Sequence, residues 1–193
     1  MCNEVRRRVA LGQIRDAFSD LRIPLRFPEG LPNLAPIESI RITDPAAIVR
    51  AAGDGEAELV VRRWSWPGPN GKPVYNFRSE GREFPAGRCL IPADGFYEFT
   101  APADPKAKRK DKWVFTKRGE DFFCVAGLWR ATDAGEAFTM LTTAPGPDVA
   151  PYHNRQIVVL ERQDWGRWLD ARVAAADLLK PLPEGALEVE RVR

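Results

Sequence analysis

The sequence predicts an α+β fold, a single compact domain dominated by mixed or antiparallel β-strands with a few flanking helices. Short apolar runs bounded by Gly, Pro, Asn and Asp recur along most of the chain. Only two stretches space their apolar residues as a helix does. The chain has 193 residues, of which 44% are hydrophobic, and this size suits one domain over residues 1–193 with its own core.

The first predicted element is an amphipathic helix over residues 10–21, which ends before Pro24. Its apolar side chains at helical spacing are Leu11, Ile14, Phe18 and Leu21. A second helix is predicted over residues 164–169. There, Trp165, Trp168 and Leu169 stand at positions i, i+3 and i+4, so they share one face.

The remaining apolar runs predict short strands. They cover residues 37–42, 59–64, 88–91, 95–99, 113–116, 122–129, 138–143, 157–160 and 187–192. Two stretches interrupt this pattern. Residues 65–73 (SWPGPNGKP) contain three prolines and two glycines and are predicted to form a loop. Residues 100–112 (TAPADPKAKRKDK) are polar and basic, which is typical of a long exposed connection between strands.

The charge of the chain does not by itself indicate a nucleic-acid partner. There are 29 Lys and Arg residues against 27 Asp and Glu, which leaves a net charge of +2. The basic residues do cluster, at positions 6–8, 62–63 and 106–112. Such clusters are more often a solvated face than a binding site.

Cysteine usage argues for a reducing compartment. The three cysteines Cys2, Cys89 and Cys124 form no CxxC pair, and the chain has a single histidine, so no zinc set is expected. No signal peptide is recognised, and no apolar run approaches the roughly 18 residues of a membrane span. We therefore expect a cytoplasmic protein with no membrane association, no metal and no cofactor, and we assign Cys89 and Cys124 to the core.

Cys2 is the first candidate for chemistry. Removal of Met1, which is common before a small residue, would leave a free α-amine and a thiol on neighbouring carbons. An α-amine has a pKa of about 7.7–8.0, so a sizeable fraction is neutral and nucleophilic near neutral pH. The amine can form a Schiff base with an aldehyde, and the thiol can close it to a thiazolidine. The alternative is that Cys2 is an incidental residue of a frayed terminus.

Glu98 is the second candidate. It lies in the segment RCLIPADGFYEF (residues 88–99), in which Pro92 and Gly95 predict a bend between two short strands. A carboxyl group among apolar residues tends to have a raised pKa and can act as a general acid or base. The alternative is that Glu98 alternates outward into water.

Two further segments carry candidate residues. His153, the only histidine, stands between a proline-rich turn and an apolar strand with Arg155 beside it, a position that suits either proton transfer or a structural role. Asn76 and Arg78 are two residues apart on an extended segment, so their side chains point to the same side and could hold a sugar or phosphate oxygen. Upstream, Trp64 and Trp66 could stack on bases or belong to the core.

These segments together resemble the SRAP family, the SOS-response-associated peptidase proteins that are viewed as abasic-site sensors. The matching segments are Met1-Cys2, residues 33–36 (NLAP), Arg63-Trp64, residues 76–80 (NFRSE), residues 88–98 (RCLIPADGFYE), residues 126–129 (AGLW), residues 141–144 (LTTA) and residues 153–155 (HNR). The resemblance covers roughly residues 2–170, and the block PADGFYE is its most specific part.

The resemblance implies roles for individual residues. Cys2 would be the covalent nucleophile, and Asn76 would orient the opened deoxyribose or its flanking phosphate. Glu98 would be the general acid and base, and His153 would assist proton transfer and hold a phosphate. The side chains expected to contact DNA are Trp64, Trp66, Arg78, Arg155 and Arg6.

The function implied is a DNA damage response protein that senses abasic sites in single-stranded DNA. It would form a covalent thiazolidine crosslink through Cys2 after removal of Met1, act as a monomer, and associate with the nucleoid during DNA damage. The family also implies a β-elimination (lyase) activity and a peptidase activity that removes residues ahead of Cys2. Two alternatives remain open: a thiol peptidase that uses Cys2, Glu98 and His153, and a non-catalytic module that binds single-stranded nucleic acid.

The chain departs from the family pattern at several positions, which predicts a divergent branch. The family opens Cys-Gly-Arg and continues its HxR motif with Met-Pro. Here Asn3-Glu4 follows Cys2, Gln156-Ile157 follows Arg155, Phe77 replaces a small residue, and the shortened tryptophan loop reads Ser65-Trp66-Pro67.

Overall fold

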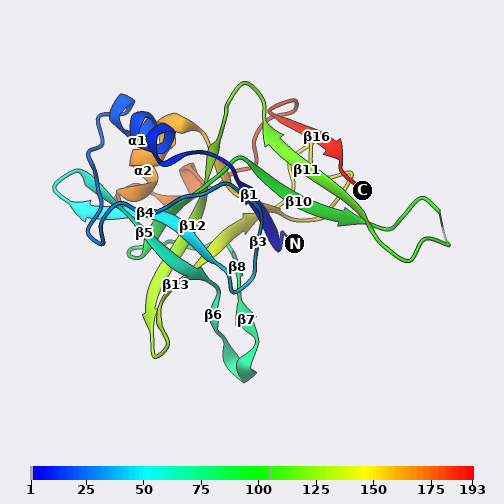
Figure 1. Ribbon diagram of the computed structural model, residues 1–193, viewed down its shortest axis with the longest axis horizontal. Helices are drawn as coiled ribbons and strands as arrows, with labels where there is room; N and C mark the ends of the chain where they lie inside the picture. The colour runs from blue at the N-terminus through cyan, green and yellow to red at the C-terminus, as the bar shows by residue number, and fades with distance from the viewer. Residues whose placement is uncertain (1, 105) are drawn as a thin grey trace.

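The computed structural model describes residues 2–104 and 106–193, and within them two β-sheets enclose the main core (Figure 1). The smaller sheet has five antiparallel strands in the order β16-β11-β10-β1-β3. Their bounds are β1 Glu4–Arg7, β3 Ile37–Arg41, β10 Gly95–Thr100, β11 Asp111–Lys117 and β16 Leu187–Arg191. This sheet places the amino-terminal strand between β3 and the central strand β10.

The larger sheet is mixed. Its main path runs β14-β13-β12-β9-β4-β5-β2, with β15 paired to β12 and β8 paired to β13. The bounds are β2 Leu25–Arg26, β4 Pro45–Gly53, β5 Glu56–Trp64, β8 Asn76–Arg78, β9 Arg88–Ala93, β12 Phe123–Thr132, β13 Gly135–Thr143, β14 Gln156–Ile157 and β15 Val159–Leu160. Strand β13 pairs in parallel with β5 and β8, and β2 pairs in parallel with β5. The predicted mixed α+β domain is therefore confirmed.

Both predicted helices are present. Helix α1, Leu11–Asp20, buries Ile14, Ala17 and Phe18, and helix α2, Trp165–Leu169, buries Trp165 and Trp168. The rings of Phe18 and Trp165 lie 5.3 Å apart between centroids, so the two helices share one apolar cluster on the outer side of the larger sheet. Single 3-10 turns cover Pro69–Gly71, Arg162–Asp164 and Ala175–Asp177. None of the helices in the described ranges is long and apolar enough to cross a membrane.

The predicted bend at residues 93–95 carries the chain from one sheet to the other. Strand β9 belongs to the larger sheet and β10, which follows after one residue, to the smaller sheet. Asp94 holds this crossing because its backbone N–H donates to the carbonyl of Arg6 at 3.0 Å and its carboxylate accepts from Arg6 Nε at 2.9 Å. The bend therefore ties β1 to the start of β10.

Three predictions of local structure need correction. Strand β4 was not predicted, because PAAIVRAAG starts with proline and is rich in alanine, which has a low β propensity. Residues 46–49 of this strand are nevertheless all buried, so tertiary packing determines it. Residues 65–73 are only partly loop, since Trp66–Pro67 and Pro73–Val74 pair as a two-stranded ribbon, β6 and β7. The predicted strand over residues 157–160 is two short strands that pair with different neighbours.

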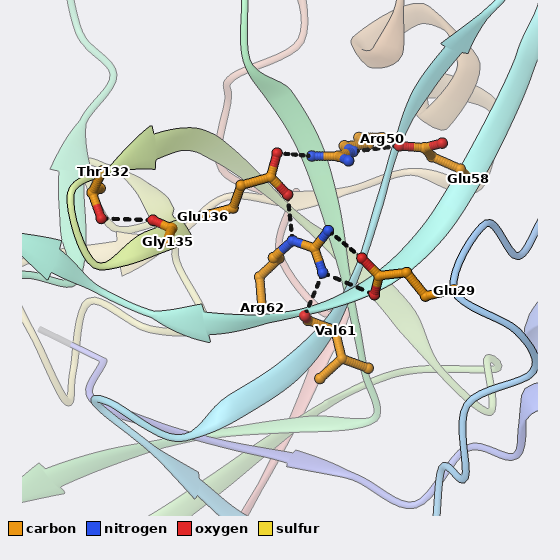
Figure 2. A network of polar contacts seen from close by, with 8 residues as sticks. All are labelled: Glu29, Arg50, Glu58, Val61, Arg62, Thr132, Gly135 and Glu136. Atoms are coloured by element: carbon orange, nitrogen blue, oxygen red, sulfur yellow. Dashed lines mark hydrogen bonds and ion pairs between the residues drawn. The ribbon is translucent and has the colours of Figure 1, made fainter.

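An ion-pair network joins three strands of the larger sheet (Figure 2). Arg50 of β4 contacts Glu58 of β5 at 2.6 Å and Glu136 of β13 at 3.1 Å. Arg62 of β5 contacts the same Glu136 at 2.5 Å and reaches Glu29 at 2.7 Å. Arg62 belongs to the basic cluster at positions 62–63, and its charge is paired with two carboxylates of the protein.

Candidate active site

Cys2 lies two residues before β1, inside the main core. Its side chain is only 1% exposed. The Asn76 amide Nδ2 donates to the Cys2 carbonyl oxygen at 2.7 Å, and the Cys2 thiol donates to the Glu4 carbonyl at 3.4 Å. Cys2 is therefore not on a frayed terminus, since both its backbone and its side chain have defined partners. Burial raises the pKa of the Cys2 thiol far above its ordinary value, and the nearby charge of Glu98 raises it further.

Glu98 lies on β10, which pairs with β1 on one side and β11 on the other. It is 2% exposed, so the alternative in which its side chain faces water is wrong. Burial raises the pKa of the Glu98 carboxyl to about 7. A carboxyl with this pKa can both give and take a proton near neutral pH, as a general acid and base requires.

His153 lies in the turn between β13 and β14. Its Nδ1 is 3.0 Å from the backbone nitrogen of Arg155 and 3.1 Å from the Arg155 carbonyl oxygen, and these contacts orient the ring. Burial lowers the pKa of His153, so the imidazole is mainly neutral at neutral pH. The preceding Tyr152 packs on Trp113, with centroids 4.8 Å apart, and Trp113 is the cross-strand partner of Glu98. This aromatic pair connects the His153 turn to the Glu98 strand.

Asn76 and Arg78 occupy the same short strand, β8, which pairs in parallel with β13. Asn76 Oδ1 is buried and has no hydrogen-bond partner among the described residues. The Asn76 amide therefore donates to Cys2, and its Oδ1 remains available as an acceptor next to Cys2. Arg78, two residues on, is exposed.

Two predicted stacking residues are buried in this structure. Trp64 is 0% exposed, donates from Nε1 to the Tyr75 carbonyl at 2.8 Å, and stacks on Phe138 with centroids 6.4 Å apart. Trp66 is 6% exposed, and the Arg130 guanidinium covers its ring at 4.3 Å. Neither indole offers a face to a base, so we assign both to the core.

Two of the predicted DNA-contacting arginines are already engaged. Both nitrogens of the Arg155 fork contact the carboxylate of Glu80, and Nη2 also donates to Thr142 Oγ1 at 2.9 Å. Arg6 is paired with Asp94, and its side chain is 12% exposed. Arg155 and Arg6 therefore bind other groups of the protein, whereas the side chain of Arg78 is exposed.

Sequence reasoning missed Lys112. It was grouped with the solvated basic loop, but its Nζ donates to Glu4 Oε1 at 2.6 Å, two residues from Cys2. Glu4 was the available sequence signal, because a buried carboxylate is usually paired with a cation. In the described ranges, no group of three or more His, Cys, Asp or Glu side chains is placed to hold a metal ion.

Comparisons with known proteins agree on the family. The model of the SOS response associated peptidase (SRAP) family matches residues 1–193. The abasic site processing protein YoqW of Bacillus subtilis is 31% identical over 100 residues, which is 49% of this chain and 43% of that protein. YoaM of Bacillus subtilis, described in the same words, is 28% identical over 116 residues, 58% of this chain and 48% of that protein. The chain thus spans about half the length of the curated relatives it matches.

Solved structures show the same fold. A protein of Bordetella bronchiseptica superposes with a TM-score of 0.72 at 23% identity over 100% of both chains. A protein of Bacteroides thetaiotaomicron superposes with a TM-score of 0.75 at 17% identity over 100% of this chain and 92% of that one. On the match of the family model along the whole chain, this protein belongs to the SRAP family.

Proposed function

We propose that this protein processes abasic sites in DNA and captures them covalently in single strands through Cys2 once Met1 has been removed. The observation that carries the proposal is the juxtaposition of Cys2 with a buried carboxyl group, Glu98, whose pKa is about 7. The printed names of the Bacillus relatives, abasic site processing proteins, support the substrate class.

The chemistry balances without a further reactant. The Cys2 amine adds to the aldehyde carbon of the ring-opened abasic sugar, and loss of one water gives the imine. The thiol sulfur then adds to the imine carbon, and the proton from sulfur ends on nitrogen. The product is a five-membered thiazolidine, and the sum is aldehyde plus aminothiol giving thiazolidine plus water. With Met1 attached, the Cys2 nitrogen is an amide and the first step cannot occur.

Glu98 fits the proton transfers of both steps. Dehydration needs an acid to protonate the leaving hydroxyl, and ring closure needs a base, because the raised pKa of the Cys2 thiol keeps it protonated. A carboxyl with a pKa of about 7 is populated in both forms at neutral pH. General acid–base assistance of this kind contributes about 10²–10⁴-fold to a rate.

The neighbouring residues position the reactants. Asn76 holds the Cys2 carbonyl, which fixes the amine and thiol relative to Glu98. Its acceptor oxygen can receive a hydroxyl of the opened sugar, and exposed Arg78 on the same strand suits a flanking phosphate. We assign His153, neutral at neutral pH, to proton transfer or phosphate contact beside the aldehyde. Holding the aldehyde against the amine can supply on the order of 7–11 kcal/mol of entropic advantage.

A thiol peptidase, the activity in the family description, fits the site less well. A thiol nucleophile reacts as the thiolate and is activated by a lowered pKa. Burial and the charge of Glu98 raise the pKa of the Cys2 thiol instead. An amine that attacks first, with the thiol following intramolecularly, does not need a pre-formed thiolate. β-Elimination from the same imine would compete with ring closure by the thiol.

The test is incubation of Met1-processed protein with a single-stranded oligonucleotide that carries one abasic site, read on a denaturing gel. We expect a shifted band that Cys2→Ala removes and that Cys124→Ala, a buried internal cysteine, retains. An oligonucleotide with no abasic site should give no band. A band that survives Cys2→Ala would refute the proposal, and so would its absence when mass spectrometry confirms a free Cys2 amine.

A further inference from the structure

A row of charged side chains starts next to Cys2 and crosses the smaller sheet. Antiparallel pairing places Glu4 of β1 opposite Arg41 of β3. Lys112 of β11 reaches over β10 to Glu4, with its Nζ 3.8 Å from the centroid of the Tyr97 ring. The row therefore spans four adjacent strands, β3, β1, β10 and β11.

This row lies on the face of the sheet turned away from Glu98, which we call the outer face. Successive side chains of a strand point to opposite faces, so Tyr97 and Phe99 lie on one face of β10 and Glu98 lies on the other. Trp113, opposite Glu98 in register, packs on Tyr152 and belongs to the core side. The two faces meet at the start of β1, which Cys2 precedes.

A pocket of about 380 Å³ runs along the outer face beside Cys2. Its lining includes Asn3, Glu4, Arg41, Phe99, Lys112 and Arg193. Three of these side chains are cationic and one is anionic. The anionic one, Glu4, is 6% exposed and is already neutralised by Lys112. The pocket therefore presents an excess of positive charge to whatever enters it.

The two arginines of the pocket are exposed but their backbones are held. Arg41 is the last residue of β3, and its backbone N–H donates to Asp44 Oδ2 at 2.8 Å. The backbone of Arg193 pairs with that of Lys112 in both directions, at 3.0 and 3.3 Å. The guanidinium groups are placed by side-chain contacts, since Arg41 Nε donates to Ser39 Oγ at 3.1 Å and Arg193 Nε donates to the Lys110 carbonyl at 3.3 Å. This order reduces the entropy lost when they bind a ligand.

We propose that this outer pocket is a phosphate subsite, formed by Arg41, Lys112 and Arg193, for the DNA backbone that flanks the captured sugar. The inference rests on the proposed function. Arginine forks match phosphate oxygens in bidentate geometry, and a fixed ammonium adds a point charge. A strand whose abasic sugar reaches Cys2 and Glu98 on the core side would turn around the start of β1 and place a neighbouring phosphate in the pocket.

The experiment measures equilibrium binding of the full chain to a single-stranded oligonucleotide without an abasic site, across a salt series. The variants are Arg41→Ala, Arg193→Ala and their double, and the control is Arg15→Ala, an exposed arginine on helix α1. Each phosphate contact contributes about 0.7 to the slope of log affinity against log salt for a single strand. We expect each pocket variant to lower the slope by up to about 0.7 and the double variant by about 0.7–1.4. Arg15→Ala should leave the slope unchanged.

A second readout separates this inference from the proposed function. Because the proposed subsite contributes to binding, the double variant should need more abasic DNA for half-maximal covalent capture, whereas Arg15→Ala should capture as the unmodified protein does. A slope no lower than that of Arg15→Ala, or an unmodified protein that does not bind DNA, would overturn the subsite. A lowered slope in a protein that captures no abasic site would leave the subsite standing and defeat the capture proposal.

Discussion

Glu98 is buried and Glu136 is partly exposed, and their surroundings drive their pKa values in opposite directions. Burial raises the pKa of Glu98 to about 7. Burial also acts to raise that of Glu136, but hydrogen bonds from Arg62 and Arg50 outweigh it and lower the pKa below its ordinary value. Glu136 therefore stays charged and joins three strands, whereas Glu98 can exchange a proton beside Cys2. Three predictions test this division, and a fourth tests a DNA contact next to the site.

The largest effect should follow from Glu98→Gln, which keeps the shape of the side chain but cannot exchange a proton. We expect the rate of covalent capture to fall by about 10²–10⁴-fold, because both dehydration and ring closure lose their proton carrier. Single-turnover gels at saturating abasic oligonucleotide measure the rate. Glu136→Gln is the matched control, and an equal loss in both variants would erase the distinction between the two carboxyl groups.

The contribution of Glu98 to the stability of the protein should fall as pH rises between about 4.5 and 7. The folded-state pKa of Glu98, about 7, lies above the ordinary value of 4.5, so the folded protein binds an extra proton in this window. The resulting stabilisation is fully present below the unfolded pKa and is lost as pH rises through the folded pKa. Its size is on the order of 3 kcal/mol.

Denaturant unfolding of the unmodified protein and of Glu98→Gln at about pH 5 and about pH 8 isolates this contribution. Because the amide does not titrate, the variant should gain stability relative to the unmodified protein at the higher pH. A constant difference between the two proteins would show that the pKa of Glu98 is not raised.

Glu136→Gln should destabilise the fold by about 1–3 kcal/mol, since it removes charge-assisted hydrogen bonds from two partly buried arginines. The expected readout is a lower midpoint of denaturant unfolding with an unchanged slope. Exposed Glu188, on β16, supplies the control Glu188→Gln, for which a change within about 0.5 kcal/mol is expected. Equal midpoints for the two variants would assign no structural role to the network.

The smallest effect should come from Arg78→Ala. Arg78 is exposed and is proposed to contact a phosphate, so its loss should weaken binding and lower the salt slope by about 0.7. Capture at saturating DNA should stay within a few-fold of the unmodified rate. A large loss of capture at saturation would instead place Arg78 among the groups that act on the reacting atoms.

The bend before β10 and the two helices were predictable, because Pro92, Gly95 and the spaced tryptophans of residues 164–169 are local signals. The pairing of Cys2 with Glu98 was not predictable from the pattern. It depends on β1 lying beside β10, a contact between residues far apart in sequence. The family resemblance supplied these residues as a set, and the structure supplies the reason why Glu98 can carry protons, which is its burial.

The tryptophans show the limit of pattern reasoning most clearly. A tryptophan at the end of a strand and before a proline-rich stretch fits an exposed stacking surface as well as a core position. The burial of Trp64 depends on Phe138 of β13, on which it stacks, and on the Tyr75 carbonyl, which accepts its Nε1–H. The burial of Trp66 depends on Arg130, whose guanidinium covers its ring. The role of Lys112 was missed because the basic run of residues 106–112 does not indicate which of its side chains contacts a buried acid.

The most direct test of the account is the mass of the complex between Met1-processed protein and an abasic oligonucleotide, formed without a reducing agent. We expect a mass equal to the sum of the two masses less one water, with the link confined to the peptide that begins at Cys2. A link at a lysine, or an adduct on the amine that survives only after chemical reduction, would contradict ring closure by the Cys2 thiol.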